Sequence, residues 1–113
     1  MKRVVIGIVS VVVLAAFAAP VLAQDTARGA KVFAEQKCSL CHSIAGKGNA
    51  KGSLDNVGGT LSADEIRQWI LDPVGMTKKS GAPRKPPMTA KYNALPKEDL
   101  EALVAYLSKL KKS

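Results

Sequence analysis

The chain has 113 residues, a length typical of one small domain and too short for two. Apolar residues fill 18 of the first 23 positions but only 35 of the remaining 90, where 15 basic against 9 acidic residues leave a net charge of +6. Two cysteines exclude a disulfide-dense scaffold, so a core this small needs another stabilising element, such as a metal or a cofactor.

Residues 1–23 have the three parts of a secretory signal peptide. A pair of basic residues precedes an apolar run from Val4 to Ala19, and the segment ends on the small residue Ala23, two positions after Val21. We expect cleavage after Ala23, so that residues 24–113 work in the periplasm or another exported location. The alternative is a membrane anchor formed by an uncleaved leader, although the run is shorter than the roughly 20 residues that span a bilayer.

The pattern after the leader predicts an all-α domain. A first helix, capped by Asp25 or Thr26, should run through Phe33 toward Cys38. Residues 43–60 are rich in glycine and are predicted to form a loop.

The second predicted helix begins after Ser62, because Ser62 and Glu65 have the spacing of a capping box. Pro73 should stop this helix, since proline lacks the backbone N–H that a helix interior needs. The apolar stripe between these two signals consists of Ile66, Trp69 and Ile70. Residues 73–96 contain five of the six prolines and are predicted to form a second loop.

A final helix is predicted from an apolar face with helical spacing. The residues of this face are Leu100, Leu103, Val104, Leu107 and Leu110. Three lysines near its end, at positions 109, 111 and 112, would suit the negative pole of a helix in the last turn. Two long loops in so small a domain are uncommon unless something functional orders them.

The segment Cys38-Ser39-Leu40-Cys41-His42 is the strongest chemical signal, because C-x-x-C-H is the attachment sequence of c-type haem. Residues three apart lie on one face of a helical turn, so Cys38 and Cys41 would each form a thioether with one haem vinyl group. His42 would then bring an imidazole nitrogen to the iron.

Two other interpretations of this motif, a thiol redox site and a zinc site, agree less well with the sequence. A thiol redox motif usually follows a strand, and no strand pattern precedes Cys38. A zinc site needs about four ligands, whereas Cys38, Cys41 and His42 exhaust the cysteines and histidines of the chain.

With no second histidine, the expected second axial ligand is a methionine sulfur, and the mature chain offers Met76 and Met88. Met88 follows Pro86-Pro87, whose restricted φ angles would stiffen the backbone that presents the thioether. Met76 lies in a stretch with little to hold it. We therefore predict Met88, with Met76, an open iron or bound water as the alternatives.

These motifs together resemble a small bacterial class I cytochrome c, over essentially all of residues 25–112. The resemblance implies an all-α fold of about three to five helices wrapped around one covalently attached haem c. In that family an N-terminal helix crosses the C-terminal helix; Gly29 and Phe33 match the first helix, and Leu103 and Tyr106 match the second.

The family also has a Gly-Pro-x-Leu stretch, in which the proline carbonyl accepts a hydrogen bond from the axial imidazole and the leucine packs on the porphyrin. The resemblance places Gly52-Ser53-Leu54 there, with Ser53 for proline, so that the loop loses rigidity. Leu54, Trp69 and Pro87 would complete the haem contacts, by packing or at a propionate, although Trp69 would also serve as an ordinary core residue. Pro96 stands where relatives have a Ser or Thr cap, which predicts a weaker cap for the final helix.

An iron held between His42 and Met88 has no vacant position, so the predicted function is one-electron transfer between redox proteins, without catalytic residues and without enzyme activity. The alternative is a haem-based gas sensor in which Met88 leaves the iron. A peroxidase-like enzyme would need a distal acid or base that the sequence does not offer near Met88.

No acidic residue stands between Asp72 and Glu98, although this segment contains six basic residues. They are Lys78, Lys79, Arg84, Lys85, Lys91 and Lys97. We interpret them as a rim that steers redox partners with acidic docking surfaces, or as a loop that lysines merely keep solvated. The expected state is a monomer with no membrane span once the leader is removed, and nucleic acid is not an expected partner.

Overall fold

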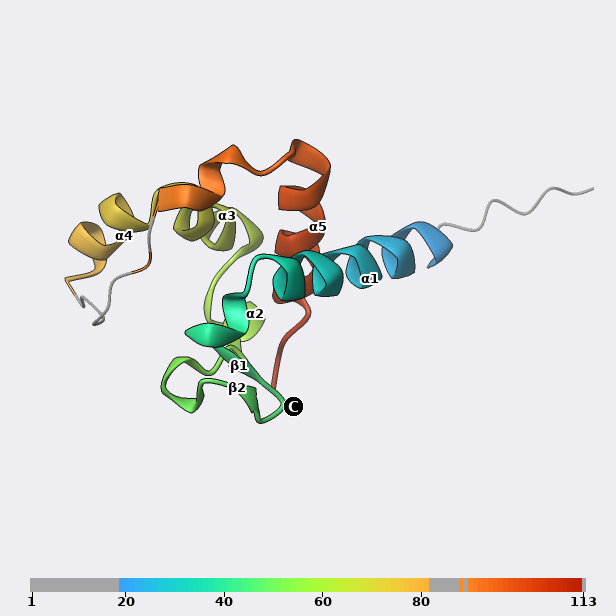
Figure 1. The fold of residues 1–113 in the computed structure, drawn as a ribbon, viewed down its shortest axis with the longest axis horizontal. Coiled ribbons are helices and arrows are strands. Elements are labelled where there is room, and N and C mark those ends of the chain that lie inside the picture. The colour runs from blue at the N-terminus through green and yellow to red at the C-terminus, as the bar shows by residue number, and fades with distance from the viewer. Residues whose placement is uncertain (1–18, 82–87, 89, 113) are drawn as a thin grey trace, which may run out of the picture.

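The computed structural model describes residues 19–81, 88 and 90–112, and in this part the protein is mostly helical, as predicted (Figure 1). The α-helices are α1 (Ala19–Glu35), α2 (Val57–Thr60), α3 (Ala63–Leu71), α4 (Pro73–Ser80) and α5 (Lys97–Ser108). Short 3₁₀ turns are η1 (Cys38–Leu40), η2 (Ala50–Gly52) and η3 (Ala90–Ala94). A two-residue antiparallel pair, β1 (Ser43–Ile44) and β2 (Lys47–Gly48), pairs Ser43 with Gly48 and Ile44 with Lys47.

Helices α1 and α5 cross each other and form the most extensive contact between elements of the described residues (Figure 1). Gly29 permits this approach, because a Cβ there would lie 2.2 Å from the carbonyl oxygen of Ala102 and 2.4 Å from Cβ of Tyr106. One turn later, the rings of Phe33 and Tyr106 meet edge to face, with centroids 6.2 Å apart. The predicted crossing of the two terminal helices is confirmed.

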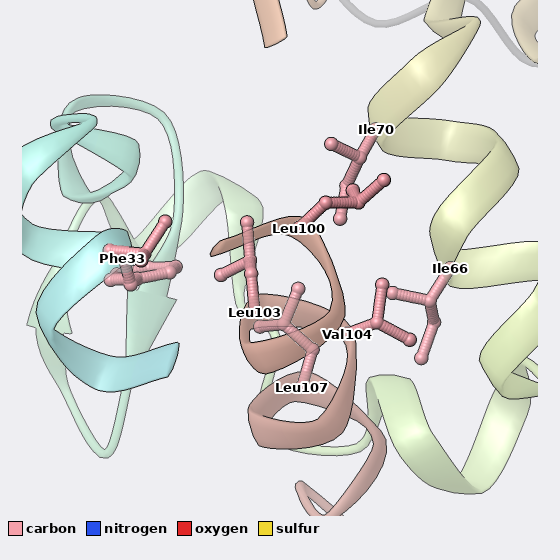
Figure 2. Close-up of a cluster of buried hydrophobic side chains, with 8 residues drawn as sticks. Phe33, Ile66, Ile70, Leu100, Leu103, Val104 and Leu107 are labelled. Atoms are coloured by element: carbon pink, nitrogen blue, oxygen red, sulfur yellow. The ribbon is translucent and has the colours of Figure 1, made fainter. Parts of the chain in front are cut away.

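The hydrophobic core lies where α1, α3 and α5 meet (Figure 2). Its buried members are Val32, Phe33, Ile66, Ile70, Leu100, Leu103, Val104 and Leu107. Each aliphatic side chain buried in this way stabilises the fold by about 1.5–3 kcal/mol relative to an exposed one. The core positions on α3 and α5 are those that the helical spacing predicted, with two exceptions: Trp69 on α3 is only half-buried, and Leu110 follows α5 and is also half-buried.

The start of α3 has the predicted capping box. Ser62 Oγ accepts a hydrogen bond from the backbone N–H of Glu65, and the Glu65 carboxylate accepts one from the N–H of Ser62. These bonds hold the pKa of Glu65 below its usual range. Helix α3 ends before Pro73, as expected, but the prediction of a loop from residue 73 onward is wrong. Pro73 is the first residue of α4, where its fixed φ is favourable, and Asp72 caps this helix by accepting from the N–H of Gly75.

Helix α1 begins at Ala19, so the predicted caps Asp25 and Thr26 lie inside it. At the other end of the chain, α5 stops at Ser108, and the predicted basic last turn is wrong because all three lysines follow the helix. The reason is a tertiary contact: the chain after α5 turns toward α2, where the N–H of Gly58 donates to the carbonyl of Leu110 over 2.9 Å. Lys109 instead donates to Thr26 Oγ1 over 2.8 Å.

The glycine-rich stretch 43–60 contains more structure than the predicted loop. Ala45 and Gly46 have consecutive positive φ angles of 52° and 80°, the geometry of a two-residue turn that joins strands β1 and β2. Helix α2 adds a single turn at the end of the stretch. Alternating patterns do not reveal strands of two residues, so this hairpin had no periodic signal.

Two further predictions concern the helix ends and the membrane. Pro96 precedes α5 without a side-chain cap, which confirms the expected weak start, although Glu98 and Asp99 in the first turn complement the helix dipole.

Within the described residues, none of the helices combines the length and the apolar character needed to cross a bilayer.

An ion pair joins α3 to α5 at the edge of the core. Arg67 donates from Nε to Glu101 Oε1 over 2.9 Å and from Nη2 to Oε2 over 2.8 Å, and it also contacts Asp64. The hydrogen bonds from Arg67 are the main reason that the pKa of Glu101 is lowered. A carboxyl with a lowered folded-state pKa stabilises the fold above its unfolded pKa and loses this contribution as the pH falls through the folded value.

We therefore expect Glu101→Gln to lower the free energy of unfolding at neutral pH by about 0.5–1 kcal/mol, a modest value because both side chains are partly exposed. The difference from the unmodified protein should vanish in acid, below the folded-state pKa of Glu101, where both proteins carry an uncharged group. Urea denaturation across this pH range measures it. Glu35→Gln, which removes only a surface pair with Lys31, is the control; an equal loss there would contradict the prediction.

Candidate functional site

The predicted attachment segment forms a tight turn directly after α1. Lys37 adopts a left-handed conformation with φ 56°, which ends the helix and starts η1. The carbonyl of Cys38 then accepts hydrogen bonds from the N–H of Cys41, over 3.1 Å, and of His42, over 2.9 Å. The five residues are thus folded back on themselves, with Cys38 half-buried and Cys41 exposed.

An apolar cleft adjoins this turn and extends into the core. It is lined by Phe33, Cys38, His42, Leu54, Val57, Leu61, Ile66, Trp69, Ile70, Met88, Tyr92, Leu103 and Leu107. The cavity between these side chains has a volume of about 160 Å³ and is partly open to solvent. Figure 2 shows how α1, α3 and α5 direct several of these residues toward one another.

Cys38 is the cysteine that faces the cleft, and burial raises the pKa of its thiol. A backbone hydrogen bond and the charge of Lys91 act in the opposite direction but are weaker. The apolar surroundings of the Cys38 thiol thus disfavour its thiolate form.

The orientation of His42 is set by a hydrogen bond to the backbone. Its Nδ1 lies 3.0 Å from the carbonyl oxygen of Gly52, and because a carbonyl only accepts, Nδ1 is the protonated nitrogen of this pair. Nε2 is then the unprotonated nitrogen, which is the form that a metal ligand requires.

This contact corrects the assignment taken from the resemblance, which implied the carbonyl of Ser53. Counting back two positions from Leu54, as in Gly-Pro-x-Leu, places Gly52 rather than Ser53 where the family has proline. The accepting carbonyl therefore belongs to the most flexible residue type, and the assignment of Ser53 was wrong by one position.

The structure separates the two candidate methionines. Met88 lines the cleft together with His42 and Cys38, whereas Met76 lies in α4 and is not among the lining residues. Pro87, predicted to contact the haem, lies outside the described residues, as do Arg84 and Lys85 of the basic segment.

Leu54 and Trp69 both line the cleft, as their predicted contacts with a haem require. Trp69 is half-buried and does not belong to the buried core cluster. The sequence indicated several other lining residues only as helix-packing positions: Phe33, Ile66, Ile70, Leu103 and Leu107. It gave no indication of three more, Val57, Leu61 and Tyr92. Val57 is the first residue of α2, in a stretch predicted to be loop, and Leu61 directly follows that helix. Only the aromatic character of Tyr92, four residues after Met88, could have indicated the third.

The cleft fits a covalently attached haem. Its lining is almost entirely apolar, as a porphyrin requires, and the nitrogen and sulfur donors are His42 and Met88, on segments far apart in the sequence. Cys38, at the edge of the cleft, and Cys41, three residues later, supply the two thiols that covalent attachment needs.

Comparison with known proteins agrees with this fit. The family model described as cytochrome c matches residues 26–111. Cytochrome c oxidase subunit 2 of Alkalihalophilus pseudofirmus is 34% identical over 93 residues, which cover 74% of this chain but 25% of that subunit, so the chain spans about a quarter of the length of this curated relative. Nothing matches among solved structures. The match over most of its length places the chain in the cytochrome c family, whose members bind haem c covalently and take part in electron transport.

Proposed function

We propose that this protein is a one-electron carrier that shuttles electrons between redox proteins outside the cytoplasm, through a haem c held between His42 and Met88. The observation that carries the proposal is the cleft itself, where both side chains and Cys38 line one apolar space. When bound, the haem supplies an iron that exchanges a single electron between its ferrous and ferric states.

Different residues of the chain would attach the haem, bind its iron and set its reduction potential. Thioethers from Cys38 and Cys41 would fix the porphyrin at the end of α1. The bond from His42 Nδ1 to Gly52 holds the ring and makes Nε2 a stronger ligand. A thioether from Met88 would favour the ferrous state and so raise the reduction potential. The apolar lining acts in the same direction, because it disfavours the additional charge of ferric iron.

If His42 and Met88 both bind the iron, they would leave no place there for oxygen or a chemical substrate, which would distinguish a carrier from an enzyme or a gas sensor. We expect the purified protein, produced in a host with haem-attachment machinery, to keep its haem through acid-acetone extraction. Its visible spectrum should be six-coordinate and low-spin, with the weak near-infrared band of methionine bound to ferric iron. Rapid and complete binding of carbon monoxide to the reduced protein would support the gas sensor with a labile Met88 instead.

The intact mass from the same preparation tests the predicted leader. Cleavage after Ala23 would leave a chain that begins at Gln24 and carries the mass of one haem. A haem-bearing chain that keeps residues 1–23 would instead support a membrane anchor.

We further propose that one partner is a terminal oxidase with an acidic docking surface. Two observations support this. The relative named as an oxidase subunit is 34% identical over 93 residues, a quarter of its own length, so in that protein a stretch similar to this chain is part of an oxidase subunit. The described part of the basic segment presents exposed side chains at Lys78, Lys79, Lys91 and Lys97. Opposite charges on two partners accelerate their encounter and make it sensitive to salt.

The expected result is that the rate at which a purified cytochrome c oxidase oxidises the reduced protein falls steeply with ionic strength. Lys91→Glu should lower that rate at low salt. Lys47→Glu makes the same charge change on β2, outside the basic segment, and serves as the matched control. Rates independent of salt and of Lys91 would indicate that the lysines only keep the loop solvated.

A further inference from the structure

The segment that carries the Gly52 carbonyl lies alongside the residues that directly follow His42. The N–H of Leu54 donates to the carbonyl of Ser43 over 2.8 Å, and Ser43 and Ser53 form an isolated parallel bridge. Ser43 is 4% exposed, so this part of the contact is shielded from water. The position of the acceptor for His42 therefore depends on how firmly residues 52–55 are held against residues 43–45.

Asp55 makes the side-chain link between these two segments. One carboxylate oxygen accepts from the backbone N–H of Ala45 over 2.7 Å, and the other accepts from Ser53 Oγ over 3.2 Å. Ser53 Oγ in turn accepts from the N–H of Asp55 over 3.4 Å. A single half-buried carboxylate thus connects the turn after His42 to the residue after Gly52.

The turn at Ala45 gives this link a mechanical role. A non-glycine residue with φ 52° is uncommon and requires support from its surroundings. The short, charge-assisted hydrogen bond from its N–H to Asp55 provides that support. At the other end of the link stands Gly52, which has no side chain of its own to restrict the backbone.

We propose that Asp55 is a positioning residue for His42, acting through Ser53 and Gly52 to keep the acceptor carbonyl in place. This rests on the proposed function only in that His42 is the axial ligand. Loss of the link would weaken the hydrogen bond at Nδ1, make the imidazole a poorer electron donor and so favour ferrous iron.

The test compares Asp55→Ala with Asp55→Asn in the haem-loaded protein. The readout is the rate at which the Nδ1 proton of His42 exchanges with solvent, followed by NMR of the reduced state, together with the reduction potential. Asp55→Ala should accelerate exchange on the order of tenfold and raise the potential. Asp55→Asn keeps an oxygen that accepts from Ala45, and it should restore most of the slow exchange.

Asp72→Ala is the matched control, because Asp72 also accepts from a backbone N–H, that of Gly75, but does so at the start of α4. It should leave the His42 exchange rate unchanged. The proposal is overturned if Asp55→Ala leaves exchange and potential as they were, or if Asp72→Ala changes them equally. If Asp55→Ala does not accumulate, Ser53→Ala should give a smaller acceleration, and no acceleration there overturns the proposal.

Failure of this proposal is separable from failure of the proposed function. The exchange rate reports on His42 and its acceptor whether or not Met88 binds the iron. The visible spectrum and the response to carbon monoxide report on Met88 whether or not Asp55 positions His42.

Discussion

Gly29→Ala is expected to lower the free energy of unfolding by about 2 kcal/mol. The added Cβ would lie 2.2 Å from a backbone oxygen of α5, and a backbone atom cannot rotate away as a side-chain end can. Overpacking of this kind lowers the free energy of unfolding by up to about 3 kcal/mol. The higher helix propensity of alanine raises it by about 1 kcal/mol, which leaves the net loss of about 2 kcal/mol. Denaturant unfolding of the haem-loaded protein measures the difference, and thermal unfolding should show a fall of roughly 10 °C.

Gly75→Ala is the matched control, because it makes the same change inside another helix. There the added Cβ would meet the carboxylate of Asp72, which is the end of a side chain and can move. The loss of part of the α4 cap should nearly offset the gain in propensity, so stability should stay within about 1 kcal/mol of the unmodified protein. Equal stability of Gly29→Ala and the unmodified protein would contradict the close crossing of α1 and α5.

Met88→Ala is expected to open one face of the iron. The near-infrared band of methionine ligation should disappear, and the reduced protein should bind carbon monoxide almost completely, where the unmodified protein binds almost none. The reduction potential should fall, on the order of 100 mV, because axial ligands set haem potentials over a range of about 0.8 V and the thioether favours ferrous iron. Absorption spectra and a redox titration make these measurements.

Met76→Ala provides the comparison, since it removes the other methionine of the mature chain from a helix that does not contribute to the cleft. It should keep the spectrum, the potential and the resistance to carbon monoxide. The reverse result, with Met76→Ala opening the iron and Met88→Ala leaving it closed, would transfer the axial role to Met76.

Much of the helical architecture could be predicted because its signals are local. In the capping box at Ser62 and in the apolar face from Leu100 to Leu107, each residue is at most four positions from the next, so helix formation brings them together without help from the rest of the chain. The same holds for Cys38, Cys41 and His42, which one turn folds together.

The prediction was weakest where distant segments decide local structure. Pro73 stops α3 as expected, yet the burial of its side chain in the packed domain favours a new helix that begins there. The predicted end of α5 was wrong because the chain after Ser108 turns toward α2, where the carbonyl of Leu110 accepts a hydrogen bond from the N–H of Gly58. No pattern near residue 108 indicates this partner.

The amino-acid sequence by itself determined the chemistry of this protein: a haem-attachment turn, two terminal helices matched to each other, and a short supply of possible iron ligands. Only the tertiary structure decided which carbonyl accepts from His42, which methionine lines the cleft beside it, and which apolar side chains complete that cleft. The physical reason is that the first set depends on spacing within a few residues, whereas the second depends on segments that meet only after the helices have packed.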